Sequence, residues 1–375
     1  KAWTYASLKA SYSLTADRGP ASNSLAVFQS FTPWRPSTSA NESAIILAAL
    51  ENSELTYEKK HELNIGVALG FVDNRINVEF DWYRRNNFDL IGYTQTMGVG
   101  GVTTKLANDA TMESTGCEFT ISTTNIKTKD FKWTTDWIFG WAENTITKLD
   151  SRSQVYSLVN GVGRTEGRPI GALYSIPFAG LTEEGLPTFY IDAEHTQVVG
   201  PGNYADIYFQ EYENIDYLKY EGTIDPKITG SFGNTFSWKG LKLNVFFTYS
   251  FGNVLRLDNL CPVYSSDYSD LTASMKEMKN RWMVPGDENV TTIPSIPTVR
   301  QMREIDALNN AYSAYNYSTE RVAKGDFIRL KELSLAYDLP KKYFEGQNAV
   351  SSFGVKLSAT NLWLAYADKK LNGRD

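Results

Sequence analysis

The side chains that could carry enzyme chemistry in this 375-residue chain are few. Only two histidines occur, His61 where a strand is expected to begin and His195 in a predicted loop. No cysteine or carboxylate stands at metal-ligand spacing from either of them. Two pairs of carboxylates could be read as general acid and base: Glu183 with Glu184, and Asp192 with Glu194. In a polar loop such groups are more often solvated, so the sequence predicts no catalytic residue, no metal and no cofactor.

A glycine cluster and two cysteines complete the search for reactive groups. The cluster Met97-Gly98-Val99-Gly100-Gly101 lacks the buried strand before it and the helix behind it that a phosphate loop needs. Cys117 stands where an apolar strand residue is expected, far in the sequence from Cys261. A buried or lipid-facing thiol is therefore favoured over a disulfide.

The composition narrows the class of protein. The formal net charge of −6 and the absence of a Lys/Arg cluster argue against nucleic acid as the main partner. No apolar run approaches the roughly 20 residues of a membrane-spanning helix. Aromatic residues make up 13% of the chain although hydrophobic residues total only 42%, which is typical of alternating strands.

The segment 63–82 is the clearest structural signal. Apolar and polar or small residues alternate along 63–71 and again along 76–82, with Asp73-Asn74 between the two runs. Successive side chains of a strand point to opposite faces, so each arm has one apolar face. Asp-Asn is turn chemistry for a short hairpin connection. The open question is whether the apolar face touches a protein core or lipid.

The same alternation predicts further strands at 3–15, 116–123, 133–141, 228–238, 241–249, 327–339 and 353–364. Between them we expect a short helix near 44–50, short strands near 170–179, and a helical segment at 268–283.

The connections between these strands alternate in length. The short ones are Asp73-Asn74, 127–130, 239–240 and 340–351, and the long ones are 17–54, 86–112, 150–221 and 258–325. Outer-membrane barrels have short periplasmic turns and long extracellular loops, whereas a soluble sandwich does not require such alternation. Trp and Tyr residues near the strand ends fit the aromatic girdles of such a barrel. The sequence thus predicts an all-β antiparallel transmembrane β-barrel, with Asp73-Asn74 on the periplasmic side.

The predicted barrel is partial. About nine main strands form an odd, open set, and unpaired strand edges in lipid are very costly. Both ends of the chain look cut, so strands before Lys1 and at least one after Asp375 are expected from sequence beyond this chain.

Six segments resemble those of SusC/RagA-type TonB-dependent transporters, in the same order along the chain. They are Leu55–Lys59 with Asn64-Ile65-Gly66, Asn108–Glu118, Glu166–Gly171, Asn280–Asp287, Lys324–Lys331 continuing to Pro340, and Ala359–Trp363. The second segment departs from the family pattern, with Ser114-Thr115 where Asn/Lys is usual and Cys117 in place of an aliphatic residue.

The resemblance implies a plugged barrel of roughly 22 strands, of which residues 1–375 would be the C-terminal portion without plug, TonB box or final strand. It implies outer-membrane active import of oligosaccharides or oligopeptides in Bacteroidota. The implied partners are a SusD-like surface lipoprotein that lids the barrel and TonB, engaged through an N-terminal part absent here.

Two sets of residues are candidates for function in such a transporter. Loop aromatics can stack on sugar rings at little entropic cost, and the substrate-contact candidates are Phe31, Trp34, Tyr264, Tyr268 and Trp282. For Trp282, packing within its loop is the favoured interpretation. Charged residues amid alternating strands should face the lumen, and these candidates are Arg329, Lys331, Glu79 and Asp81. Pairing with lumen carboxylates is the simpler role for Arg329 and Lys331.

Two alternatives compete with this interpretation. A soluble β-sandwich or jelly-roll, acting as a glycan-binding module or glycan-active enzyme, would explain the aromatics but not the alternating connections. A siderophore or cobalamin transporter would share the barrel but lack the six segments. The imported substrate cannot be chosen from the sequence.

Overall fold

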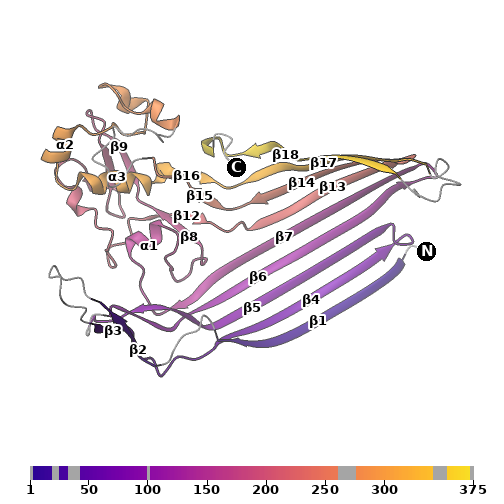
Figure 1. Cartoon of the computed structure of the whole chain (residues 1–375), viewed down its shortest axis with the longest axis horizontal. Coiled ribbons are helices and arrows are strands. Elements are labelled where there is room, and N and C mark those ends of the chain that lie inside the picture. The colour runs from indigo at the N-terminus through magenta and orange to yellow at the C-terminus, as the bar shows by residue number, and fades with distance from the viewer. Residues whose placement is uncertain are drawn as a thin grey trace.

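The computed structural model describes residues 3–18, 25–32, 43–98, 102–260, 276–340 and 353–371. Its main element is a nine-stranded antiparallel sheet in the order β1-β4-β5-β6-β7-β13-β14-β17-β18 (Figure 1). The strands are β1 (Trp3–Asp17), β4 (Glu58–Phe71), β5 (Ile76–Gln95), β6 (Thr104–Lys127), β7 (Phe131–Leu149), β13 (Ile228–Trp238), β14 (Leu241–Phe251), β17 (Phe327–Asp338) and β18 (Gly354–Ala367). No second sheet packs across it in the described residues, so the sandwich alternative is wrong.

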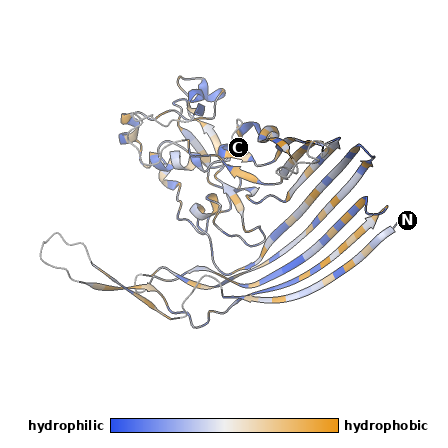
Figure 2. Cartoon of the chain, turned by 45° about the vertical axis from the view of Figure 1, so that its right-hand side comes forward, coloured by the Kyte–Doolittle hydropathy of each residue, from blue (hydrophilic) through white to orange (hydrophobic). Residues whose placement is uncertain are grey.

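The register gives the sheet one apolar and one polar face. Val67 lies opposite Phe80, and Phe80 lies opposite Phe119 on the next strand. Directly paired residues share a face, so the apolar positions of neighbouring strands line up across the sheet. The same holds at the other end of the sheet, where Phe247 is paired with Leu330. Figure 2 shows the resulting alternation of hydrophobic and hydrophilic residues along the strands.

Cys117 lies on this apolar face, between Trp82 and Trp141 of the flanking strands. It is a free thiol, whereas Cys261 lies outside the described residues.

The connections sort by length to opposite ends of the sheet. Those after β4, β6 and β13 are tight turns at one end, and the connections 150–227 and 252–326 lie at the other end (Figure 1). One predicted long connection, 86–112, is wrong: β5 and β6 continue through most of it and leave only 96–103 between them. A register shift between Asn87 and Ile91, with Asp89 at a φ of 57°, interrupts the alternation that would have revealed these strand ends.

The sequence suggested a short helix near 44–50, and this expectation is wrong. Ala44–Ala49 forms strand β3, which pairs with β2 (Val27–Phe31) in a separate two-stranded ribbon. Its run of Ala, Ile and Leu suits a helix or a strand equally by periodicity, and the pairing with β2 decides between them. In Figures 1 and 2 this ribbon extends away from the rest of the connections.

The two longest connections fold together into a packed unit, here called the loop domain, of residues 150–227, 252–260 and 276–326. It holds α1 (Val155–Val159), α2 (Val299–Glu304), α3 (Leu308–Asn316) and the short strands β8 (Ala172–Ser175), β9 (Phe178–Leu181), β10 (Pro187–Tyr190), β11 (Val198–Val199), β12 (Lys219–Thr223), β15 (Val254–Arg256) and β16 (Val322–Lys324). The short strands predicted near 170–179 are therefore confirmed. Of the predicted helical segment 268–283, only Lys276–Asn280 is described as helical, as a 3-10 turn, while 261–275 lie outside the described residues.

A hydrophobic core fills the loop domain. Phe189, Tyr204 and Tyr315 are fully buried in it, together with three apolar residues of α1 and most of α3. Burial raises the pKa of the Tyr217 hydroxyl, at the edge of this core, to about 12. The connections are thus an ordered second layer over one end of the sheet.

Two arginines, Arg256 half-buried and Arg321 buried, tie the segments of the loop domain together. Arg256 donates to the carbonyl oxygens of Val159 (3.1 Å), Tyr174 (2.5 Å) and Ser318 (3.0 Å). Burial lowers the pKa of its guanidinium to about 10. Arg321, only 3% exposed, forms an ion pair with Glu277 at 2.6 Å. Among the described residues, no helix is both long and apolar enough to cross a membrane.

Candidate functional site

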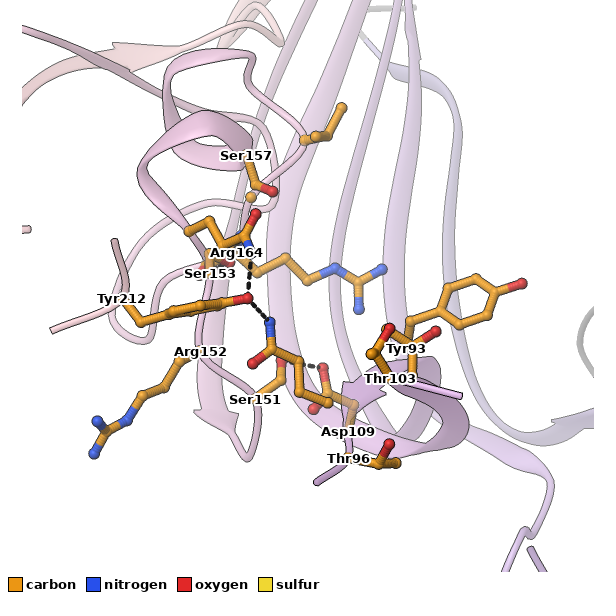
Figure 3. Close-up of a pocket in the computed structure, with 15 residues that line it drawn as sticks. Tyr93, Thr96, Thr103, Asp109, Ser151, Arg152, Ser153, Ser157, Arg164 and Tyr212 are labelled. Carbon is orange, nitrogen blue, oxygen red and sulfur yellow. Dashed lines mark hydrogen bonds between the residues drawn. The ribbon is translucent and has the colours of Figure 1, made fainter. Parts of the chain in front are cut away.

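A polar cavity of about 590 Å³ lies where the strand ends of the main sheet meet the loop domain. The ends of β5 and β6 form one side, and the segment 151–164 with Tyr212 forms the other (Figure 3). Six Ser and Thr side chains line it: Thr96, Thr103, Thr104, Ser151, Ser153 and Ser157. Val162 is the one aliphatic side chain of the lining. The cavity is therefore suited to a ligand with many hydrogen-bonding groups.

Asp109, on β6, is the buried charge of this cavity. Its residue is 2% exposed, and Oδ2 accepts a 2.8 Å hydrogen bond from the Ser151 hydroxyl. Its backbone carbonyl accepts from the amide of Asp150 at 2.9 Å, which fixes the strand end against the loop. Oδ1 is buried and has no hydrogen-bond partner among the described residues. A buried carboxylate oxygen without a donor is costly, so the Asp109 carboxylate keeps unused capacity to accept hydrogen bonds.

Arg164 faces the same space from the loop domain. Its backbone is held by Ser153, whose hydroxyl accepts from the Arg164 amide at 2.8 Å and donates to its carbonyl at 2.9 Å. The side chain extends across the cavity toward Tyr93 (Figure 3). Within the described residues, neither Arg164 nor Arg152 forms an ion pair.

Gly92 forms the floor between these two charges. A Cβ atom at this position would lie 3.1 Å from Nη1 of Arg164 and 3.2 Å from Oδ2 of Asp109. Both distances are tighter than ordinary contacts of a Cβ atom. The missing side chain of Gly92 therefore keeps open the gap between the carboxylate and the guanidinium.

Tyr212 closes the opposite side. Its hydroxyl accepts hydrogen bonds from the side-chain amides of Gln95, at the end of β5, and Gln154, just before α1. The ring is thereby held between the sheet and the loop domain. Two further cavities, of about 450 and 610 Å³, adjoin this one and share Ser151, Arg152 and Tyr212 with it. Together they form an extended polar groove.

The substrate-contact candidates predicted from the sequence do not meet in this groove. Phe31 lies at the end of β2, 40% exposed, and Trp34, Tyr264 and Tyr268 lie outside the described residues. The Trp282 ring lies against Gly185, and its indole nitrogen donates to Glu288 at 3.0 Å. This geometry agrees with the packing role that was favoured for Trp282.

The lumen-facing candidates all lie on strands of the main sheet. Glu79 is paired with Ala68 and Thr120, and Asp81 with Gly66 and Glu118, on the face opposite to Phe80. Arg329 is paired with Thr248, and its guanidinium lies 5.4 Å from the Phe327 ring centroid. Lys331 donates to Oδ1 of Asn361 at 3.0 Å across a register shift between β17 and β18. That the polar face lines a lumen remains a prediction for all four.

The segments that resemble the transporter family contact one another in two pairs. Each contact lies where the regular strand pairing of the sheet is interrupted. Asn108 accepts from the amide of Thr56 at 2.8 Å and donates to the carbonyls of Thr56 and Asp89, at the bulge of β5. The contact of Lys331 with Asn361, whose φ is 56°, stabilises the second such point. These motif residues hold the sheet and do not line the groove.

The groove residues were missed by the sequence interpretation. Asp109, Arg164 and Tyr212 carry no motif of their own, and they come from three segments far apart in the chain. One signal was present: Asp109 directly follows Asn108 within a family-like segment.

The fold and its relatives define the class of protein. In its sheet and connections the chain has the architecture of one part of the barrel of an outer-membrane transporter, and it is similar to the structure of the RagAB peptide transporter. That similarity has a TM-score of 0.72 at 22% identity and covers 97% of this chain and 37% of the other. The RagAB peptide importer in a closed state gives a TM-score of 0.71 at 24% identity. At these identities the likeness shows the fold.

The sequence relatives point to the same family. The chain is 27% identical to TonB-dependent receptor P3 of Formosa agariphila over 342 residues, which is 87% of this chain and 31% of the relative. It is 34% identical over 99 residues to TonB-dependent receptor SusC of Bacteroides thetaiotaomicron, which is 26% of this chain. No family model matches the chain.

The resemblance to SusC/RagA-type TonB-dependent transporters is therefore confirmed, and the chain is a relative of receptors and transporters rather than of enzymes. It spans about a third of the length of the relatives that it matches over most of its own length.

Proposed function

We propose that this chain is the C-terminal part of the barrel of an outer-membrane transporter that imports an oligosaccharide or oligopeptide with energy delivered through TonB. The observation that carries the proposal is the relationship to TonB-dependent receptors along most of the chain. The two-faced sheet supports it, because a wall between lipid and lumen needs an apolar face outside and a polar face inside.

The arrangement of the connections supports an orientation for this wall. The tight turns lie on the periplasmic side and the loop domain with its groove lies on the extracellular side, as in outer-membrane barrels generally. A ligand arriving from outside would meet the groove before it enters the lumen. The loop domain would also present the surface for a SusD-like lipoprotein lid, our proposed partner.

The charged candidates of the sheet fit this proposal as lumen residues. Glu79 and Asp81 lie two residues apart on one face, with Glu118 beside Asp81. Arg329 and Lys331 lie far across the sheet from them, on β17. Phe31 stays a proposed substrate contact because its exposed ring can stack on a ligand.

The test is uptake by cells that carry the full-length transporter. Deletion of the gene should abolish uptake of the imported oligomer, and removal of TonB or dissipation of the proton gradient should do the same while binding to the cell surface persists. Uptake that continues without TonB contradicts the proposal. A lipoprotein that copurifies with the transporter in detergent supports the proposed partner, and a transporter that is always isolated alone argues against it.

A further inference from the structure

The gap between Asp109 and Arg164 has the features of a ligand site, and the proposed import function does not say which ligand would bind there. Among the described residues, Oδ1 of Asp109 has no hydrogen-bond partner and the Arg164 guanidinium has no ion-pair partner. Gly92 leaves room between the other oxygen, Oδ2 of Asp109, and Nη1 of Arg164. Ser151 holds the Asp109 carboxylate, and Ser153 holds the backbone from which the Arg164 side chain extends. The carboxylate and the Arg164 backbone are therefore positioned before any ligand arrives.

We propose that this gap binds an uncharged sugar ring through two adjacent hydroxyl groups, one donating to the Asp109 carboxylate and one accepting from Arg164. This inference rests on the proposed import function and selects a glycan over a peptide as its substrate. A hydroxyl group both donates and accepts, so a pair of them satisfies a carboxylate and a guanidinium at once.

The charges of the lining favour a neutral ligand. An anion attracted to Arg164 would be repelled by Asp109, and a cation attracted to Asp109 would be repelled by Arg164. The N–H and C=O of a trans peptide group point in opposite directions, so one peptide group cannot reach both sides of a short gap, whereas two adjacent hydroxyls of a sugar ring can. A sugar ring uses both groups without a net charge, and each hydrogen bond to a charged partner is stronger than a neutral one.

The rest of the cavity fits the same ligand. Its six Ser and Thr hydroxyls and the amides of Gln95 and Gln154 offer neutral donors and acceptors on several sides. Tyr93 is 71% exposed at the rim and provides a ring face on which the C–H face of a sugar can stack. The adjoining cavities of about 450 and 610 Å³ continue the groove and give room for further sugar units.

The test measures binding by the full-length transporter, purified with any lipoprotein that accompanies it. The probes are neutral hexasaccharides (maltohexaose, laminarihexaose and xylohexaose), the acidic hexagalacturonate and the peptide hexaalanine. We expect a neutral hexasaccharide to bind, and the Kd for it to rise about tenfold or more in Asp109→Asn and Arg164→Gln. Binding of the acidic or the peptide probe in preference, or of no neutral probe, overturns the proposal.

A second variant separates the site from a folding defect. Gly92→Ala keeps both charges and adds one methyl group to the gap, so it should weaken binding of the same probe while heat-modifiable migration on gels stays normal. The matched control is Arg303→Gln, which removes an exposed arginine of α2 that lines none of the three cavities and should change the Kd by less than about threefold. Unchanged binding in Gly92→Ala, or equal loss in Arg303→Gln, contradicts the assignment.

Uptake distinguishes this inference from the proposed function. If the wild-type transporter imports a probe through TonB and the gap variants import it equally well, the sugar site is wrong and the import function stands. If a neutral hexasaccharide binds through Asp109 but its uptake does not depend on this transporter, the site stands and the import function is wrong.

Discussion

At the scale of single residues, the family-like motifs serve the backbone of the sheet. Asn108 is the clearest case, because its amide makes three hydrogen bonds to backbone groups of Thr56 and Asp89. The bulge at Asp89, with its positive φ, leaves backbone groups that ordinary pairing cannot satisfy. The side chain of Asn108 satisfies them and joins two family-like segments at one point.

Asn108→Ala should therefore destabilise the folded sheet by about 0.5–1.5 kcal/mol, since it removes hydrogen bonds to exposed and half-buried backbone groups of Thr56 and Asp89. The measurement is a urea titration in detergent, with the folded fraction read from heat-modifiable migration. Asn289→Ala is the control, because that amide donates one 3.3 Å hydrogen bond in an exposed turn. An equal shift of the midpoint in both variants would contradict this role for Asn108.

The turn after Trp282 should respond to pH. Oδ2 of Asp287 accepts from the amides of Met283 (2.9 Å) and Val284 (3.0 Å), and these bonds lower the pKa of the Asp287 carboxyl. A carboxyl with a lowered folded pKa stabilises the turn above its unfolded pKa of about 3.9 and loses that effect as the pH falls through the folded value.

Hydrogen exchange of the peptide 282–291, corrected for the intrinsic rate, should thus show protection at pH 6 that falls below about pH 4. In Asp287→Asn the protection should be weak at both pH values. Protection in the wild type that does not change on acidification would show that Asp287 does not hold the turn.

The sequence did not allow us to predict which residues line the groove, because none of them stands out from its local sequence. Asp109 becomes special because Ser151 and Asp150 cover it and because Arg164 faces it over Gly92. These neighbours are far apart in the chain and come together only through the register of β5 with β6 and the packing of the loop domain. The local sequence pattern carries no information about contacts between residues that are far apart in the chain.

At the scale of elements, alternation predicted the strands and their faces well. All nine strands of the main sheet were expected, because a half-buried strand leaves a period of two in the sequence. The errors lie where that period breaks: the bulge of β5 hid the ends of β5 and β6, and uniformly apolar β3 resembled a helix. Helix α2 could have been predicted, since Thr298 and Gln301 form a capping box at its start.

The two faces of β14 can be tested by charge. Phe247 lies on the apolar face opposite Leu330, and its neighbour Thr248 lies opposite Arg329 on the polar face. Phe247→Arg and Leu335→Arg should each destabilise the assembled barrel by about 2–4 kcal/mol if the apolar face meets lipid. Thr248→Arg should be tolerated, and it is a better control than Ser334→Arg because Ser334 is buried at 6% exposure. Equal heat-modifiable migration of all these variants would contradict the assignment of faces.

At the scale of the whole molecule, the chain combines a wall with an independently packed loop domain. The wall was predicted from the alternation of short and long connections, but the packing of those connections was not. The core of the loop domain joins Val155 and Leu158 of one connection to Tyr312 and Tyr315 of the other. Contacts between segments so distant in sequence leave no periodicity to read.

The loop domain should therefore lose its order separately from the wall. Arg321→Met removes the 2.6 Å ion pair with the half-buried Glu277 and a hydrogen bond to the carbonyl of Asp258. Removing one member of a buried pair costs about 3–5 kcal/mol, and none of these three residues belongs to the nine-stranded sheet.

We expect rapid trypsin cleavage within 252–326 in Arg321→Met, loss of uptake, and unchanged heat-modifiable migration of the barrel. Arg300→Met is the matched control, because its ion pair with Glu304 is exposed at 82% and 60% and such pairs contribute about 0.3–0.5 kcal/mol. If the barrel and the loop domain of Arg321→Met lost their structure together, the two layers would form one cooperative unit. If only the loop domain were cleaved, a barrel would remain in the membrane without its ligand groove, because Arg164, Tyr212 and their neighbours depend on that layer for their positions.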